Sequence, residues 1–165
     1  MLAKAKETLV ARGRYDVQGH LFELQNTLYT EIPITRHFNL KVGSYDGHSL
    51  RLDAPLAENI NHAGTAFGGS LSSLVTLAGW SIVWFILRES HLEGEIVIQD
   101  GACNYLLPVT RDFSAYCYKP EASQIARFER MLRSHGRARL ELEAVILDDD
   151  KVAVSFRGRY VVNTT

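Results

Sequence analysis

One stretch decides the fold of this chain: residues 59–87, which read NINHAGTAFGGSLSSLVTLAGWSIVWFIL. The stretch contains no acidic or basic residue other than His62. A polar, glycine-rich loop here runs into a long helix that lacks the charged face of an ordinary surface helix. The pattern predicts a buried helix whose first backbone N–H groups, which have no partner inside the helix, face a polar ligand.

Helical spacing divides this helix into two faces. A broad apolar face contains Leu71, Leu74, Val75, Ala78, Ile82 and Phe85. The other face is small and polar at first and becomes apolar from Trp80 onward, so we expect the C-terminal half to be buried on all sides. The length reaches the ~20 residues that span a bilayer. The small and hydroxyl residues of the first half lower its hydropathy, so we predict a core helix and no membrane partner.

Around this helix the periodicity predicts two further helices and six strands. Leucines at three- and four-residue steps indicate a helix over residues 17–31, which Pro33 ends. Strands follow over 38–44 and 48–54, joined by an Asp-Gly turn. After the long helix we expect strands over 95–107 and 113–118, a short helix over 121–133 and two alternating strands. The side chains expected to face inward are every second residue from Ala138 to Ile146 in the first of these two strands, and Val152, Val154, Phe156, Tyr160 and Val162 in the second.

This order predicts an α+β fold in which a curved antiparallel sheet is wrapped around the long central helix. Each strand alternates, so one face of the sheet must be covered, and only the long helix is large enough to cover it. We expect a single domain over residues 1–165, with an additional N-terminal helical extension over about 1–36.

Composition limits the class of function. The net charge of −1 gives no nucleic-acid footprint. Two cysteines, Cys103 and Cys117, are too few for a disulfide framework and are expected to be reduced core thiols, facing each other across a hairpin. Residues 1–13 lack the apolar segment of a signal peptide, so the protein is expected in the cytoplasm. We predict no metal site.

The loop, the helix and the element order together resemble the hotdog-fold thioesterases. The matching residues are Asn61, Gly64-Thr65 and Gly68-Gly69, and the run GTAFGGSL with Trp80 most resembles the YiiD C-terminal-type thioesterases. The segments 104–108 and 134–137 look like a later strand end and turn of that family. The resemblance implies the hotdog fold, a homodimer or dimer of dimers with the site between protomers, and an acyl-CoA or acyl-carrier thioester as substrate. Coenzyme A is then part of the substrate, and no cofactor is expected.

The sequence departs from better-understood members of that family at two positions. Phe67 stands where they have a histidine, and Thr76 stands where they have a helix carboxylate that attacks the thioester or activates water.

The expected site lies at the start of the long helix. The Gly69 amide is the predicted donor to the thioester oxygen, because Gly68 and Gly69 let a ligand approach the backbone. Asn61 is predicted to orient a water or the carbonyl. The alternatives are tight loop packing for the glycines and a local loop bond for Asn61. The substrate-binding residues predicted with Gly68 are Gly64, Thr65, Phe67 and Ser72.

The general base is harder to place. Thr76 and Ser72 are on the same side of the helix as Gly69, and either hydroxyl could hold a water or merely permit close packing. Asp100 is the carboxylate candidate, since a charge inside an apolar strand is costly unless it is paired or functional. Its neighbour Gly101 suggests a bulge or a close approach.

Basic residues gather between Lys119 and Arg139. Arginine suits phosphate, so we predict that Gly136 and Arg137 contact coenzyme A, the alternative being an ordinary solvated face. The leading function is thioester hydrolysis by water attack. The alternative is a non-catalytic acyl-thioester binding or regulatory protein, because the helix carboxylate is missing. A hotdog dehydratase would need a paired histidine and acid that the sequence lacks.

Overall fold

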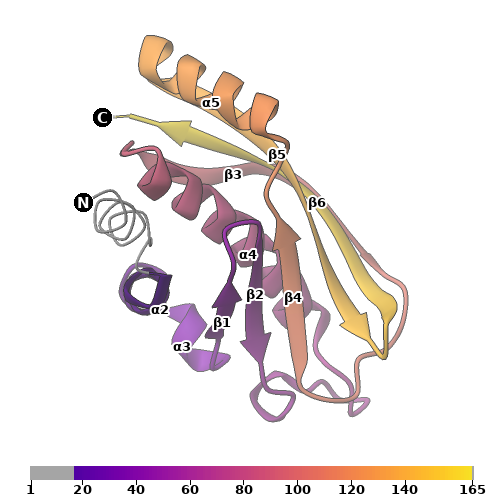
Figure 1. Cartoon of the computed structure of the whole chain (residues 1–165). Coiled ribbons are helices and arrows are strands. Elements are labelled where there is room, and N and C mark those ends of the chain that lie inside the picture. The colour runs from indigo at the N-terminus through magenta and orange to yellow at the C-terminus, as the bar shows by residue number, and fades with distance from the viewer. Residues whose placement is uncertain (1–16, 165) are drawn as a thin grey trace, which may run out of the picture.

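A computed structural model describes residues 17–164 of the chain. Six antiparallel strands form one curved sheet in the order β1-β2-β4-β5-β6-β3 (Figure 1). The strands are β1 (Lys41–Tyr45), β2 (Ser49–Ala54), β3 (Glu95–Tyr105), β4 (Phe113–Tyr118), β5 (Arg137–Asp148) and β6 (Lys151–Asn163). The helices are α2 (Val17–Glu31), α3 (Ile34–His37), α4 (Gly68–Glu89) and α5 (Ala122–His135), with a 3-10 turn η1 (Ala57–Asn59).

The sheet curves around α4, as the sequence predicts (Figure 1). α4 packs against β2, β3, β4, β5 and β6. Every residue from Ser81 to Leu87 is buried, which confirms that the C-terminal half of the helix is enclosed on all sides. α4 is long and apolar enough to cross a membrane, but 72% of its most apolar window is buried inside the protein. Its apolar surface therefore forms the core.

The last two strands confirm the predicted alternation, with one exception. The inward side chains of β5 from Ala138 to Ile146 are buried, and Val154, Phe156 and Tyr160 of β6 are buried with them. Val152, predicted to face inward, is 39% exposed. The register between the two strands shifts beyond the pair Ile146–Val154, because Leu147 pairs with Val152. A one-residue shift turns side chains to the opposite face of the sheet, and Val152 lies on the far side of this shift.

Other differences lie near the ends of elements. α2 has the predicted bounds and ends before Pro33, but Pro33 (φ −58°, ψ −26°) leads into the short helix α3, which the sequence did not predict. β3 ends at Tyr105, two residues earlier than expected. β3 and β4 are not neighbours in the sheet, so the expectation that Cys103 and Cys117 face each other across a hairpin is wrong. Burial raises the pKa of the Cys117 thiol to about 12. The signal-peptide expectation concerns residues outside the described part.

The two edge strands of the sheet differ in how far their outer backbone groups are already hydrogen-bonded. At the β1 edge, the side-chain amide of Gln25 on α2 accepts a hydrogen bond from the Val42 amide (2.8 Å) and donates one to the Leu40 carbonyl (3.3 Å). The Tyr29 hydroxyl also donates to the Leu40 carbonyl (2.7 Å). These bonds occupy backbone groups that another strand would need. At the opposite edge, β3 is paired on one side only, with β6.

Candidate functional site at the N-terminus of α4

The first backbone amides of α4 are open. Phe67 precedes the helix in an extended conformation (φ −65°, ψ 130°), and no side chain of the described residues caps the helix. The first helical bond runs from the Leu71 amide to the Phe67 carbonyl (3.0 Å). Within residues 17–164, the amides of Gly68, Gly69 and Ser70 have no hydrogen-bond acceptor. Three donors at the positive end of the helix dipole can therefore bind an oxygen that carries negative charge.

Asn61 organises the loop that leads into α4. Its side-chain oxygen accepts bonds from the amides of Ala63 (2.9 Å) and Thr65 (3.2 Å). Its side-chain nitrogen donates to the Thr65 hydroxyl (2.9 Å) and the Ala66 carbonyl (3.4 Å). Gly64 adopts a φ of 78°, which favours glycine. The side-chain nitrogen and oxygen of Asn61 both form hydrogen bonds inside the loop, which fits the local-bond alternative for Asn61.

The loop is fixed to the body of the protein at its other end. The Phe67 amide donates to the Asn59 carbonyl (2.7 Å), and the Ala66 amide donates to the Val109 carbonyl (2.8 Å). The Asn59 side chain is 2% exposed and donates to the carbonyls of Phe38 (2.9 Å) and Pro55 (2.7 Å). These bonds hold the start of α4 in place. Donors that are already fixed need no reorganisation when charge develops on a bound oxygen.

Two aromatic rings flank the open amides. Phe67 is 56% exposed, and its ring lies over Gly69, so that a Cβ on Gly69 would come within 2.2 Å of it. Tyr105, at the end of β3, is 53% exposed, and its hydroxyl donates to the Gly68 carbonyl (3.1 Å). Partial burial raises the pKa of Tyr105. Sequence reasoning used Tyr105 only for its family resemblance. Its place at a strand end did not indicate that it meets the helix.

Hydroxyl groups continue the site along α4. The Ser72 hydroxyl donates to the Gly69 carbonyl (3.0 Å). Thr76 lies one turn further and is half-buried, and its side chain makes no hydrogen bond within the described residues. The Thr76 carbonyl accepts a bond from the buried Tyr160 hydroxyl (2.6 Å), and burial raises the pKa of Tyr160. The described part of the chain contains no group of three His, Cys, Asp or Glu residues that could hold a metal ion.

The expectation that Asp100 is a buried charge is wrong. Its side chain is 52% exposed and forms an ion pair with Arg159. Arg159 precedes the buried Tyr160, so Asp100 lies on the face of the sheet turned away from α4. The bulge is confirmed, because the β3–β6 register shifts between Ile98 and Asp100, and Gly101 lies so close to a phenylalanine that a Cβ would come within 2.9 Å. The sequence could not reveal that β3 is an edge strand with an exposed outer face.

The predicted coenzyme A contacts lie at the other end of the sheet. Gly136 ends α5 in a left-handed conformation (φ 64°), and its amide donates to the Leu132 carbonyl (2.9 Å). Arg137 is exposed and lines a cavity of about 370 Å³ with Arg127 and Arg139, between α5 and β5. Arg137 is in register with the start of β3, whereas α4 begins near its end, where the Tyr105 hydroxyl donates to the Gly68 carbonyl. A single protomer therefore does not bring these residues together.

Comparison with known proteins identifies the family. Residues 21–164 match the family described as "Putative thioesterase (yiiD_Cterm)". A solved structure of a protein of unknown function from Chlorobaculum tepidum has a TM-score of 0.88 and 32% identity, covering 90% of this chain and 97% of that one. A thioesterase structure from Shewanella oneidensis, named as putative, has a TM-score of 0.77 and 31% identity, covering 88% and 97%.

A more distant structure, a probable thioesterase from Pseudomonas aeruginosa, has a TM-score of 0.72 at 20% identity, covers 86% of this chain and 94% of that one, and supports the fold alone. The matched model spans most of the sequence, and the neighbouring structures share the sheet wrapped around a long helix. The chain is therefore a hotdog-fold protein and belongs to the putative thioesterase family of the YiiD C-terminal type.

Proposed function

We propose that this protein hydrolyses acyl-CoA or acyl-carrier thioesters in the cytoplasm, with the thioester carbonyl held at the N-terminus of α4. The observation that carries this proposal is the set of open amides at Gly68, Gly69 and Ser70, none of which has an acceptor within residues 17–164. The Gly69 amide is the principal donor. It strengthens its bond as the carbonyl oxygen gains charge, and one such donor lowers the barrier by about 3 kcal/mol.

Water attacks the carbonyl carbon and forms a tetrahedral intermediate. Its collapse breaks the C–S bond and releases the thiolate, and the proton lost by the attacking water ends on that sulfur. Ser72 and Thr76 supply hydroxyls that can hold the water by hydrogen bonds. Gly64 and Thr65 act with Asn61 by holding the loop, while Phe67 and Tyr105 form the walls beside the reacting group.

A homodimer completes this proposal, with β3 of two protomers paired edge to edge. β3 carries exposed apolar side chains, including Val97 at 50% and Ile98 at 40%. An exposed edge of this kind promotes association, whereas the β1 edge is occupied by Gln25 and Tyr29. Antiparallel pairing would place the start of one β3 beside the end of the other. The partner's Arg137 and its neighbours would then lie at the same end of the assembly as the open amides, where they can bind the phosphates of coenzyme A.

The alternative function is a protein that binds acyl thioesters without hydrolysing them. One observation favours it: the hydroxyls of Ser72 and Thr76 have no carboxylate or histidine as hydrogen-bond partner within residues 17–164. A hydroxyl without a base activates water poorly. Binding with no turnover across a panel of acyl-CoA thioesters would favour this alternative.

The decisive test compares two substitutions at Gly69. Gly69→Ala and Gly69→Pro both place a Cβ where Phe67 now lies, and its exposed ring can turn aside. Only proline removes the amide N–H. Proline is tolerated in the first helical turn, and Gly68 before it has no Cβ to clash. We expect thiol release to show that proline lowers kcat about 10²- to 10³-fold relative to alanine. Equal rates in the two variants would show that the amide does not hold the oxygen.

The dimer is tested separately. Val97→Lys places a charge on the free edge of β3, and charged edge strands resist pairing. We expect a monomer in sedimentation and loss of thioester hydrolysis. Phe22→Lys adds the same charge to an exposed residue of α2, which packs against β1 at the opposite edge of the sheet, and is the control that should leave the dimer intact.

A further inference from the structure

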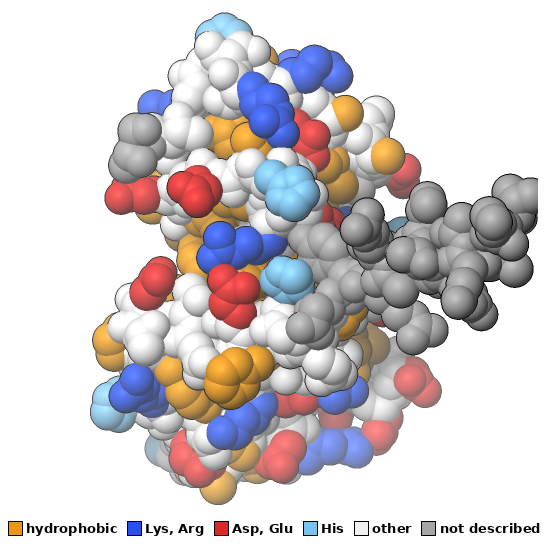
Figure 2. Space-filling view, turned by 60° about the vertical axis from the view of Figure 1, so that its left-hand side comes forward, with side chains coloured by type: hydrophobic (Ala, Val, Ile, Leu, Met, Phe, Trp, Pro, Cys, Tyr) orange, Lys and Arg blue, Asp and Glu red, His pale blue; other side chains and the backbone are white. Residues whose placement is uncertain are grey.

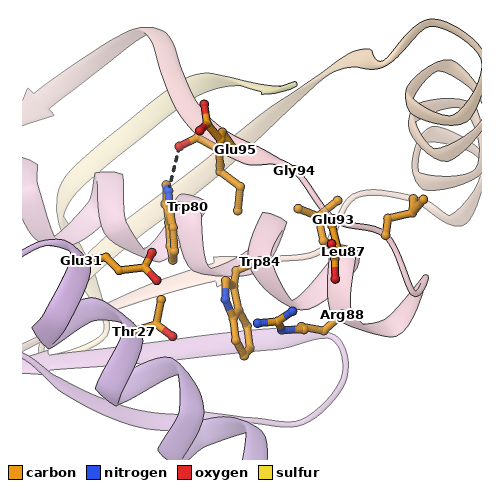
Figure 3. A pocket seen from close by; sticks show the side chains of 11 residues that line it. Thr27, Glu31, Trp80, Trp84, Leu87, Arg88, Glu93, Gly94 and Glu95 are labelled. Carbon is orange, nitrogen blue, oxygen red and sulfur yellow. Dashed lines mark hydrogen bonds between the residues drawn. The ribbon is translucent and has the colours of Figure 1, made fainter. Parts of the chain in front are cut away.

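A cavity of about 400 Å³ lies beside the C-terminal half of α4, between α2 and the start of β3. α2 contributes Thr27 and Glu31 to its wall, and α4 contributes Trp80 and Trp84. Figure 3 shows both indole rings projecting from α4, with Thr27 and Glu31 on the neighbouring helix. On the face seen in Figure 2 the outline of the molecule is indented on the left, and hydrophobic side chains are visible there between acidic and basic ones.

The aromatic walls of this cavity are held in place. The Trp80 indole N–H donates to the Ile96 carbonyl (3.1 Å), which ties the ring to β3. Trp84 is 6% exposed and meets the Phe85 ring edge-on at 5.2 Å, while the Arg88 guanidinium lies 4.9 Å above it. Rings fixed on several sides cannot retreat from a ligand. Walls fixed in this way restrict the shape of any occupant.

The charges at the cavity mouth are mostly negative. Glu31, Glu93 and Glu95 line it and are exposed. Among the described residues that line the cavity, Arg88 is the only cation, and it is paired with Glu23 (2.8 Å). A mouth of this sign opposes an occupant that itself ends in a carboxylate.

The position of the cavity relates it to the open amides through the β3 edge. α4 runs antiparallel to β3: Gly68 meets the end of the strand at Tyr105, and Trp80 meets its start at Ile96. Within one protomer, Gly68 and Trp80 are about 18 Å apart along the helix. A two-fold axis through the middle of β3 exchanges the ends of the strand. In the dimer proposed above, it would bring the partner's open amides to the same end of the assembly as the mouth of this cavity.

We propose that this cavity receives the acyl group of a thioester whose carbonyl is held by the partner's α4, and that Trp80 limits the length of the acyl group. The inference rests on the proposed function and on pairing through β3. It names the substrate class as uncharged, apolar acyl groups and excludes acyl groups that end in a carboxylate. Each dimer then has two equivalent sites, and neither is complete in a monomer.

The test measures binding of saturated S-alkyl-CoA thioethers, which cannot be hydrolysed, to the whole protein by calorimetry. Trp80→Ala enlarges the cavity, so we expect the chain length that binds best to increase, with Kd for longer chains improved at least about tenfold over wild type. Thr27→Trp fills the cavity from the opposite wall without altering α4, so it should shift the optimum toward shorter chains. Asn26→Trp, an exposed neighbour on α2 outside the cavity, is the matched control and should leave the profile unchanged.

Thiol release from acyl-CoA, measured in parallel, reports on the proposed function separately. Hydrolysis that persists with the same chain-length profile in Trp80→Ala and Thr27→Trp would overturn the cavity inference and leave the thioesterase proposal standing. Thioether binding that shifts as expected without hydrolysis would support the cavity in a binding protein and overturn the enzyme. Preference for a carboxylate-terminated acyl-CoA, or a Thr27→Trp variant that folds and binds as wild type does, would overturn the cavity inference.

Discussion

Gly79→Ala tests the contact that sets how closely α4 lies against β6. A Cβ at this position would lie 2.2 Å from the Tyr160 hydroxyl oxygen and 2.5 Å from the ring carbon that bears it. Tyr160 is fully buried and donates to the Thr76 carbonyl, so its ring has no space to retreat. Overpacking of this kind costs about 2 kcal/mol and loss of the hydrogen bond about 1 kcal/mol. The higher helix propensity of alanine offsets about 1 kcal/mol.

The net loss in the free energy of unfolding is about 2 kcal/mol, which lowers Tm by roughly 4 to 8 °C for a domain of this size. Urea unfolding and calorimetry measure it directly. The same substitution in a Tyr160→Leu background should be neutral or stabilising, because the ring that it strikes is gone. An equal loss in both backgrounds would refute the steric reasoning, and so would a loss below about 0.5 kcal/mol in the wild-type background.

Three further outcomes are expected. Gln25→Ala should lower the unfolding free energy by about 1 to 2 kcal/mol in urea titration by leaving the Val42 amide unpaired, whereas Gln18→Ala, exposed on the same helix, should not. Hydrogen bonds from the Ser49 and His48 amides lower the pKa of Asp46. The contribution of Asp46 to stability is therefore present above the ordinary carboxyl pKa and is lost on acidification. The difference in unfolding free energy between wild type and Asp46→Asn should shrink between pH 7 and pH 3. Gly136→Ala should cost about 1 kcal/mol because of its positive φ, and a large change in KM for acyl-CoA without loss of stability would contradict its role as a helix end.

Much of the fold could be predicted because its elements carry local signals. α2 and β4 have the predicted bounds, and the alternation of β5 identifies its buried face. The uncharged run of α4 indicates burial, because its apolar C-terminal half has no charged face to turn toward water. The glycine-rich loop indicates open amides, because a helix that starts without a capping side chain leaves its first N–H groups without partners.

The contacts of the polar side chains in and around the candidate site could not be predicted from local sequence in the same way. The position of Asn61 in the loop predicts an amide that orients the substrate or a water, yet its hydrogen bonds are inside the loop. Asp100 reads as a charge in an apolar strand, yet it pairs with Arg159 on the exposed face. Tyr105 gives no signal of its own and still reaches the start of α4. Each of these outcomes depends on which hydrogen-bonding or charged group the folded chain brings next to the side chain.

The sequence by itself determined where helices and strands form, which helix is the core and where backbone donors are left open, since these follow from the period of apolar residues and from local backbone preferences. Only the tertiary structure decided that β3 is the free edge, that Gln25 occupies the other edge and that Trp80 walls a cavity. Those features depend on contacts between segments far apart in the chain. The order of strands in a sheet is set by the packing of all of them together, and no local pattern records it.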